Sequence, residues 1–234
     1  MFTKLEDTQI AELNERWSKI AVSNVHDALE KLGYPNQCMN IQIKAVDSYQ
    51  KLVGPAVTVK GRYLDLTPEE RKLHADPNHE KMNAHIYKGC VLVFEGAGEY
   101  QSAKVGEFLA RGVKGQGANG IVVDGAVRDM DELIKMKDFA VFASAASPFP
   151  VGHRFLFEDY DEPISVRGSL TSVIRVDPGD WIVGGRDGVV IVPQAVMYEA
   201  LEEAEQIEEL EIKLRHALEE GIPFMEARRM FQRT

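Results

Sequence analysis

Residues 120–129 read Gly-Ile-Val-Val-Asp-Gly-Ala-Val-Arg-Asp, and this stretch decides the fold class. The run Ile121-Val-Val123 contains no polar side chain, which is typical of a strand buried on both faces, as in a parallel sheet. Asp124-Gly125 predicts a turn directly after that strand. Residues 130–136 then predict a helix. A buried strand that leads into a helix indicates an α/β fold.

The segments on either side continue this alternation of helices and strands. Residues 8–32 carry apolar side chains at helical spacing and stop at Gly33-Tyr34-Pro35. A break is expected at Ser23-Asn24, where one of the two side chains would cap the second helix. The other predicted helices are residues 76–88 and 105–111, and the predicted strands are residues 56–60, 90–94, 140–143, 172–176, 181–183 and 188–193.

Residues 194–220 predict a long amphipathic helix. Apolar side chains recur there at spacings of three and four from Met197 to Leu218. The opposite face is densely acidic, which most simply indicates a solvated surface. No internal repeat or low-complexity linker interrupts the chain, so residues 1–234 are expected to form a single domain.

Composition narrows the class of protein. The 234 residues carry a formal net charge of −10 without a basic cluster, so no nucleic-acid partner is expected. No apolar run approaches the ~18 residues that a membrane span needs, so no membrane partner is expected either. Two cysteines, Cys38 and Cys90, are too few for a disulfide framework, and the acidic N-terminus has no apolar leader. These features predict a cytoplasmic location.

Several common sequence motifs of binding sites occur in this chain but are weak evidence for a functional site. Residues 115–120 match the G-x-G-x-x-G of dinucleotide sites but precede a strand instead of following one, so they predict a helix-to-strand connection. His26, beside Asp27 in a predicted helix, is either an oriented base or a hydrogen-bonded helix residue. The cysteines have no C-x-x-C partner, and the clustered histidines lack the i, i+4 spacing of a metal site: His74, His79 and His85.

The segment with the strongest chemical signal combines Gly106-Glu-Phe-Leu109 with Arg128-Asp129, and twenty residues separate Glu107 from Arg128. Ligands of α/β proteins bind beyond the carboxyl ends of strands, where Arg128 and Asp129 are expected. An arginine binds a carboxylate through two parallel hydrogen bonds, and an aspartate supplies an oxygen to Mg²⁺. A 2-oxo acid offers a carboxylate beside a ketone oxygen, which suits this pair. The alternative is that Asp129 only caps the next helix through a capping box with Glu132, and that Arg128 is an ordinary surface residue.

The pattern Gly-Glu-x-Leu, followed at this spacing by Asp-Gly-x-Val-Arg-Asp, resembles the 4-hydroxy-4-methyl-2-oxoglutarate aldolase family. That family also includes the regulator of ribonuclease activity A proteins, which are often mislabelled as demethylmenaquinone methyltransferases. Further stretches of the chain are similar to the opening helix, the first strand and the closing hairpin of the family: residues 23–33, 53–59, 177–180 and 187–193.

The resemblance implies a divalent-metal-dependent (class II) pyruvate aldolase with a swivelling β/β/α fold, phosphohistidine-domain-like, assembled as a trimer or hexamer. It implies that Asp129 ligates Mg²⁺ or Mn²⁺ and that Arg128 binds the pyruvate carboxylate or enolate. It implies that Glu107 orients water and that the loop from Gly106 through Glu107 and Phe108 to Leu109 offers backbone amides to the substrate. A glutamate from a neighbouring subunit's terminal helix can complete such a site, and the candidates are Glu208 and Glu211.

The chain also departs from the family pattern. Ser144 stands where the family often has an arginine, and Gly185 stands where it commonly has an aspartate. The predicted loop that contains Pro148, Pro150 and Pro163 is longer and more aromatic than usual. The half of the site that would hold pyruvate therefore matches the family, whereas the part that would recognise the rest of the substrate does not.

Three functions follow as hypotheses. The first is a metal-dependent lyase that cleaves a 4-hydroxy-2-oxo acid to pyruvate and a second carbonyl compound, with oxaloacetate decarboxylation as a side activity. The second is a Schiff-base aldolase, which needs a desolvated lysine, although no sequence pattern marks Lys104 or Lys114 as buried. The third is a non-catalytic protein-binding regulator, in which the acidic surface engages a basic partner.

Overall fold

The fold is organised around strand β5 (Gly120–Val127), every residue of which is buried. The computed structural model describes residues 5–47, 50–64, 67, 69–70, 79–152 and 154–231. Parallel pairing joins β5 to β3 (Val91–Phe94), β4 (Ala103–Val105) and β6 (Ala140–Ala146). The apolar run in β5 is explained by this position, because neighbouring strands and side chains cover it on all sides.

The remaining strands extend and curl the sheet. Its order is β1-β6-β5-β3-β2-β10-β11, and β7 adds to β2. The first and last strands of this order approach each other, since β1 also contacts β10 and β11, so the sheet nearly closes on itself. A separate hairpin, β8 with β9, contributes buried apolar side chains to the core enclosed by the sheet. The bounds of these strands are Lys44–Ala45 (β1), Leu52–Tyr63 (β2), Phe155–Tyr160 (β7), Ile164–Arg167 (β8), Val173–Val176 (β9), Trp181–Gly185 (β10) and Gly188–Val192 (β11).

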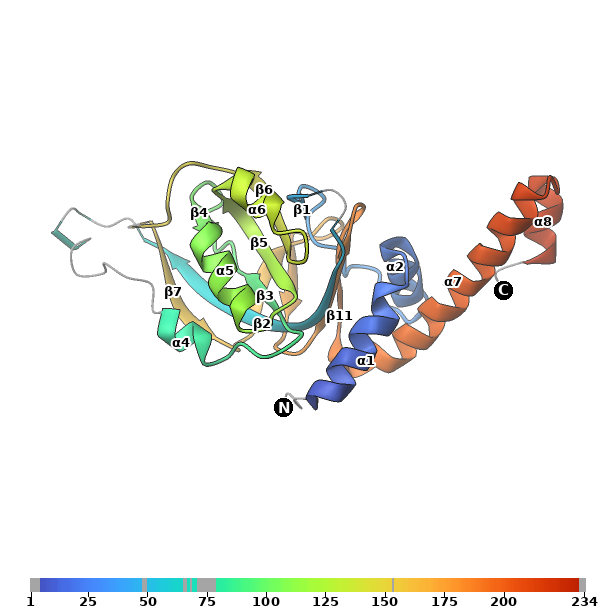
Figure 1. The fold of residues 1–234 in the computed structure, drawn as a ribbon, viewed down its shortest axis with the longest axis horizontal. Helices are drawn as coiled ribbons and strands as arrows, with labels where there is room; N and C mark the ends of the chain where they lie inside the picture. The colour runs from blue at the N-terminus through green and yellow to red at the C-terminus, as the bar shows by residue number, and fades with distance from the viewer. Residues whose placement is uncertain are drawn as a thin grey trace.

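Helices cover the sheet in two groups (Figure 1). Helices α5 (Glu107–Gly115) and α6 (Met130–Lys135) pack beside β5, and the short α4 (His79–Asn83) lies near β7. Helices α1 (Asp7–Ser18), α2 (Val22–Lys31) and α7 (Met197–Glu219) bury a second core against β10 and β11. The predicted α/β fold with a long C-terminal helix is confirmed.

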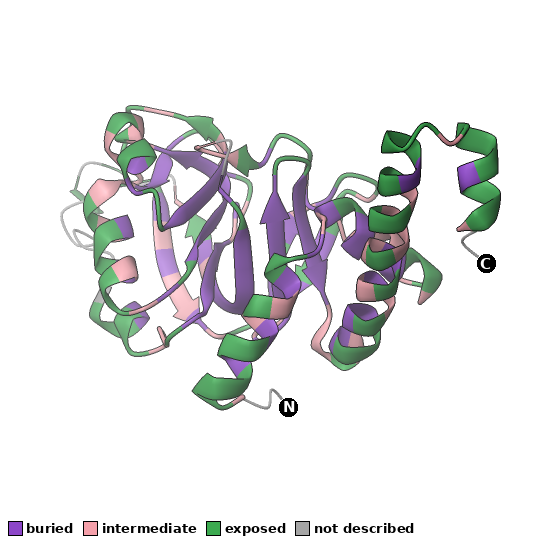
Figure 2. Cartoon of the chain, turned by 45° about the vertical axis from the view of Figure 1, so that its right-hand side comes forward, coloured by how far each residue is buried: buried purple, intermediate pink, exposed green. Residues whose placement is uncertain are grey.

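The C-terminal helix begins with the 3-10 turn η1 (Gln194–Val196) and projects beyond the sheet (Figure 1). The first half of α7 buries the predicted apolar stripe, for example at Leu201 and Ile207. Its second half and helix α8 (Phe224–Met230) are largely exposed (Figure 2). The apolar stripe of α7 therefore extends beyond the part of the helix that packs against the rest of this chain.

The predicted turn at Asp124-Gly125 is wrong. Strand β5 continues to Val127, and its register with β6 shifts between Val123 and Ala126. The buried carboxylate of Asp124 accepts hydrogen bonds from the backbone N–H and the Nε of Arg167, at 2.8 and 2.7 Å. A partner far away in the sequence therefore holds this turn-forming residue inside a strand.

The break in the N-terminal helix also differs from the prediction. Helix α1 ends at Ser18 and α2 begins at Val22, so Asn24 lies in the first turn of α2 and is not its cap. The carboxylate of Glu208 accepts hydrogen bonds from the Ala21 N–H and the Asn24 Nδ2, at 2.8 and 2.9 Å. A glutamate of α7 thus supplies the acceptor that a local cap would provide.

The predicted long loop before residue 172 contains two strands, β7 and β8. Phe155, Phe157 and Tyr160 of β7 are buried, and β7 pairs antiparallel with β2. The prolines that predicted a loop fall outside both strands. In the region of the predicted helix 76–88, the structure describes α4 over residues 79–83, while residues 76–78 and His74 lie outside the described residues.

Candidate active site

The predicted site residues follow two adjacent parallel strands. Strands β4 and β5 end at Val105 and Val127, and the Arg128 N–H donates to the Val105 carbonyl at 3.0 Å. Helix α5 begins directly after Gly106, and α6 begins directly after Asp129. The two halves of the pattern, separated by twenty residues in the chain, therefore meet at the carboxyl edge of the sheet.

Gly106 allows these halves to approach closely. A Cβ atom at this position would lie 2.5 Å from Asp129 Oδ2 and 3.0 Å from Arg128 Nε. The backbone of Gly106 is extended, with φ −124° and ψ −176°, so the torsion angles themselves do not require glycine. Glycine is needed because the side chains of two candidate site residues occupy the space of its missing Cβ.

Asp129 adopts a left-handed backbone conformation, with φ 61° and ψ 40°. Apart from glycine, aspartate and asparagine tolerate this region best, and the conformation costs an L-residue about 1–2 kcal/mol. Asp129 precedes α6 but makes no side-chain capping hydrogen bond to it. Instead its Oδ2 accepts the backbone N–H of Glu107 at 3.1 Å. The capping-box alternative is wrong, because the carboxylate faces α5.

The N-terminus of α5 presents backbone donors next to this carboxylate. The first hydrogen bond of the α5 ladder runs from the Ala110 N–H to the Gly106 carbonyl, at 3.1 Å. The N–H groups of Phe108 and Leu109 therefore precede any partner within the helix. The Phe108 side chain is 83% exposed, so this turn faces solvent. Helix N-termini bind anions through such donors and through the helix dipole.

Arg128 and Asp129 line an open pocket of about 420 Å³. Their side chains are 41% and 38% exposed, and Arg128 Nε lies 3.5 Å from Asp129 Oδ2. The exposure leaves the guanidinium accessible to an incoming anion. The rest of the pocket wall comes from the start of α6 and the end of β6: Met130, Ala146, Ser147 and Pro148.

Glu107 lies at the edge of the site. Its carboxylate accepts a hydrogen bond from Arg111 Nε at 2.6 Å, one turn further along α5. Arg111 also lies 3.5 Å from Glu132 of α6. This charge network fixes the position of Glu107 and connects the two helices that carry the site.

The donor set at this edge suits Mg²⁺ or Mn²⁺ better than a metal that needs a full protein cage. Asp129 Oδ1 has no hydrogen-bond partner among the residues that the structure describes. Among the same residues, no group of three metal-ligating side chains occurs at this edge. Mg²⁺ commonly keeps several waters and takes only one or two protein carboxylates, so one aspartate beside a substrate carboxylate fits its chemistry.

The structure of one chain does not bring Glu208 and Glu211 to this edge. Both carboxylates bond Asn24 Nδ2, at 2.9 and 3.0 Å, where α7 packs against α2. Neither residue lines the pocket at Arg128 and Asp129. Their action on a neighbouring subunit stays a prediction.

A buried polar cluster formed by Lys104 and Glu99 was not predicted from the sequence. Lys104 of β4 is 3% exposed, and its Nζ lies 3.3 Å from Glu99 Oε2 and 4.5 Å from the centre of the Phe155 ring. Burial lowers the pKa of Lys104, although Glu99 opposes this effect. The sequence does not reveal this burial, because a lysine between two apolar residues of a short strand is the pattern of a solvent-facing side chain, whereas all three residues of β4 are buried. Lys114, by contrast, pairs with Asp138 near the surface.

The same cluster accounts for the departure at Ser144. The guanidinium of Arg167 donates to Ser144 Oγ at 3.1 Å and stacks over the Tyr100 ring, with its carbon 3.8 Å from the ring centre. Arg167 of β8 therefore places its guanidinium next to Ser144 of β6, the position at which the family often has an arginine. Gly185 has a steric reason of its own, because a Cβ there would lie 2.9 Å from a methyl group of Val22.

The glycine-rich stretch serves structure in this fold, and so does His85, the one of the three clustered histidines whose side chain the structure describes. Residues 115–120 connect the end of α5 to the start of β5, as predicted. His85 Nδ1 lies 3.1 Å from Asp161 Oδ2, and its ring stacks on Tyr160.

Comparison with known proteins decides the family. Residues 22–191 match the family model described as RraA-like, Aldolase/RraA. The chain belongs to the RraA-like family. This finding confirms the resemblance that the Glu107 and Arg128-Asp129 element predicted.

Individual relatives of this RraA-like protein support the same placement. An uncharacterized protein of Methanocaldococcus jannaschii is 32% identical over 215 residues, which cover 87% of this chain and 93% of that protein. A Burkholderia mallei protein named "Putative 4-hydroxy-4-methyl-2-oxoglutarate aldolase" is 39% identical over 109 residues, which cover 47% of this chain and 62% of that protein.

Solved structures show the same fold. The Streptomyces coelicolor RraAS2 structure, titled as an unusual member of the RNase ES inhibitor RraA family, has a TM-score of 0.74 at 23% identity. The match covers 88% of this chain and 97% of that one. An uncharacterized Pseudomonas syringae protein has a TM-score of 0.79 at 21% identity and covers 97% of this chain and 100% of that one. None of the helices within the described ranges combines the length and apolar character that a membrane crossing requires.

Proposed function

We propose that this protein is a divalent-metal-dependent lyase that cleaves a 4-hydroxy-2-oxo acid, such as 4-hydroxy-4-methyl-2-oxoglutarate, to pyruvate and a second carbonyl compound. The observation that carries the proposal is the convergence of Arg128, the left-handed Asp129 and the free N-terminal turn of α5 around Gly106. A cation, a hard oxygen ligand and backbone donors are the groups that a 2-oxo acid needs.

Each residue of the proposed site has a separate role in this reaction. Arg128 binds the substrate carboxylate, and the N–H groups of Phe108 and Leu109 bind the same anion from the end of α5. The C3–C4 bond breaks, its electron pair passes to C3, and the 4-hydroxyl loses its proton as C4 becomes a carbonyl carbon. Glu107, held by Arg111, orients the water that takes this proton. Protonation at C3 then releases pyruvate.

Asp129 would hold the metal through Oδ1, the oxygen that does not accept the hydrogen bond from the Glu107 N–H. When bound, Mg²⁺ or Mn²⁺ supplies Lewis-acid stabilisation of the negative charge that develops beside the substrate carboxylate. Because oxaloacetate decarboxylation passes through the same pyruvate enolate, we expect it as a side activity. The relatives named as putative aldolases support this reading, while Streptomyces coelicolor RraAS2, described as an unusual member of an RNase ES inhibitor family, supports the non-catalytic alternative.

The Schiff-base alternative has one observation in its favour, the buried Lys104 with its lowered pKa. Its ammonium is occupied by Glu99 and lies against the Phe155 ring, and it does not line the pocket at Arg128. Borohydride treatment in the presence of pyruvate separates the two chemistries. A metal-dependent enzyme stays unlabelled, and a lysine imine is trapped as a stable adduct.

The decisive experiment measures pyruvate release, coupled to lactate dehydrogenase, after metal removal and restoration of Mg²⁺ or Mn²⁺. We expect release from 4-hydroxy-4-methyl-2-oxoglutarate or oxaloacetate to fall by about 10²-fold or more in Arg128→Ala and Asp129→Ala. Arg175→Ala is the matched control, because Arg175 forms an exposed ion pair with Asp177 on β9. Near-normal turnover in Arg128→Ala would contradict the assignment.

We also infer that the protein works as a homo-oligomer, a trimer or hexamer, in the cytoplasm. The support is the exposed apolar surface of the projecting C-terminal helices, where Phe224, Met225 and Met230 are each more than half exposed. Surfaces of this kind commonly mark contacts with another chain. Light scattering on the full chain measures the assembly, and a monomer at micromolar concentration would contradict it.

A further inference from the structure

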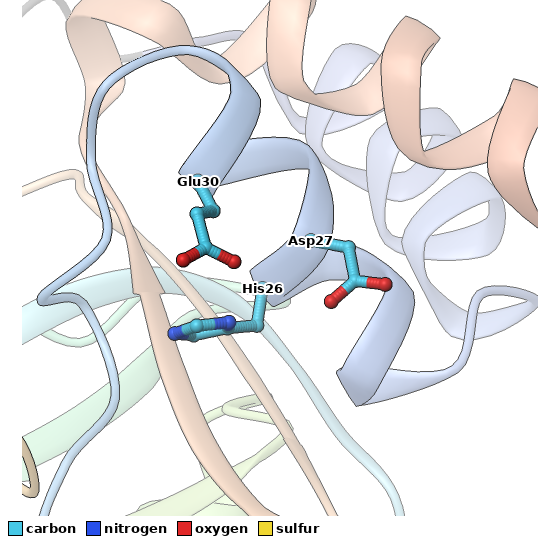
Figure 3. A group of neighbouring side chains, drawn as sticks. All are labelled: His26, Asp27 and Glu30. Atoms are coloured by element: carbon cyan, nitrogen blue, oxygen red, sulfur yellow. The ribbon is translucent and has the colours of Figure 1, made fainter. Parts of the chain in front are cut away.

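Helix α2 brings three metal-ligating side chains together, away from the proposed active site. His26, Asp27 and Glu30 each offer one ligand atom, and these atoms all lie within 4.8 Å of one another. Figure 3 shows the three side chains projecting from α2, with the carboxylate of Glu30 above the imidazole of His26 and that of Asp27 to its right. The i, i+4 relation of His26 and Glu30 places both on one face of the helix.

The end of α2 orients the imidazole. Gly33 adopts φ 85°, and the Tyr34 N–H donates to the Leu29 carbonyl at 2.8 Å, which closes the helix and turns the chain back. This turn places the Pro35 carbonyl 3.2 Å from His26 Nε2. A carbonyl oxygen can only accept a hydrogen bond, so Nε2 is the donor, and Nδ1 is the ring nitrogen that can bind a metal ion. Metal-binding histidines are commonly fixed in this way, by a carbonyl that accepts the N–H of the other ring nitrogen.

We propose that His26, Asp27 and Glu30 bind a divalent first-row transition-metal ion, with Zn²⁺ as the probe of choice. Protein ligands of Zn²⁺ lie about 2.0–2.2 Å from the ion, so three of them are separated by roughly 3–4 Å. The 4.8 Å limit on the ligand atoms here is therefore within a small side-chain adjustment of a bound geometry. One imidazole and two carboxylates favour such an ion over Mg²⁺, which prefers oxygen alone.

The charges around the cluster favour a cation. Two carboxylates one helical turn apart repel each other, and an ion between them removes this repulsion. The adjacent Lys31 pairs with Glu203 of α7, at 2.6 Å. The site lies on α2, which packs against α7 and β11, whereas the proposed active site lies on α5 and α6.

The test is equilibrium dialysis of the full chain against Zn²⁺ in excess Mg²⁺, with Cys38→Ser as the parent because a thiol also binds zinc. We expect the parent to bind one more equivalent of Zn²⁺ than His26→Gln or Glu30→Gln. His216→Gln is the matched control, because His216 of α7 and Glu220 at its C-terminal cap form an i, i+4 pair at 3.4 Å, and among the described residues no third ligand joins them. Asp129→Ala should also keep the ion, which separates this site from the proposed active site.

A second readout uses Co²⁺ in place of Zn²⁺. The parent should show the visible absorption of a nitrogen- and oxygen-ligated cobalt site, and Glu30→Gln should lose it. Glu30 is exposed, so this variant is expected to fold, and thermal unfolding verifies that. Equal zinc stoichiometry in the parent and Glu30→Gln, or no bound zinc in the parent, would overturn the proposal.

Discussion

Gly106→Ala tests whether the close approach of the two sequence elements matters for function. The new Cβ would lie 2.5 Å from Asp129 Oδ2, so the carboxylate must move by about 0.9 Å to reach an ordinary contact of 3.4 Å. Arg128 Nε, at 3.0 Å, must move as well. The substitution thus displaces the two groups of the proposed site without removing either of them.

A displacement of about 1 Å in a catalytic group can lower a rate by about 100-fold, which corresponds to about 2.7 kcal/mol of transition-state stabilisation. We expect kcat/KM for pyruvate release to fall by that factor in Gly106→Ala. Unfolding free energy should change by about 1 kcal/mol or less, because both displaced side chains are more than one third exposed. The coupled lactate dehydrogenase assay and urea unfolding measure the two quantities.

Gly112→Ala is the matched control on the same helix. A Cβ at Gly112 would meet no atom within 4 Å, and glycine is unfavourable inside a helix. This variant should keep full activity and gain up to about 1 kcal/mol of stability. A folded Gly106→Ala protein with normal turnover would refute the argument, as would equal losses in both variants.

Three further predictions concern the core and the metal. Burial raises the pKa of Asp180 from its ordinary 3.8 to about 6, so the stability linked to its protonation is complete only below about pH 3.8 and is lost as the pH rises through 6. Between pH 7 and pH 4, wild type should gain about 2 kcal/mol of unfolding free energy relative to Asp180→Asn, and a constant difference would contradict this. Lys104→Met should lower the free energy of unfolding in urea by about 3 kcal/mol, because it removes the charged partner of the buried Glu99 carboxylate. Adding Glu99→Gln should recover part of that loss, and no recovery would mean that the two residues are not coupled. Removal of divalent metal with a chelator should abolish pyruvate release, and Mg²⁺ or Mn²⁺ should restore it; activity that survives chelation would favour Schiff-base chemistry.

Much of the architecture was predictable because it depends on local patterns. The unbroken apolar run at Ile121–Val123 requires burial on both faces, and the spacing from Met197 to Leu218 requires a helix with one apolar side. Where a local pattern competed with a distant contact, prediction was wrong. Asp124 lies in a strand and Asn24 inside a helix because Arg167 and Glu208, far away in the sequence, bind them.

Most of the helices and strands, the family, and the position of Glu107, Arg128 and Asp129 after neighbouring strands follow from the sequence, whereas β1, β4, β7 and β8 were not predicted from it. Periodicity and motif spacing are properties of short segments, so they can be read without a fold. The tertiary structure alone decided that Asp129 turns from its own helix towards α5 and that Lys104 is buried against Glu99. These outcomes depend on which surfaces meet when the sheet curls, and contacts between distant segments leave no periodic trace in the chain.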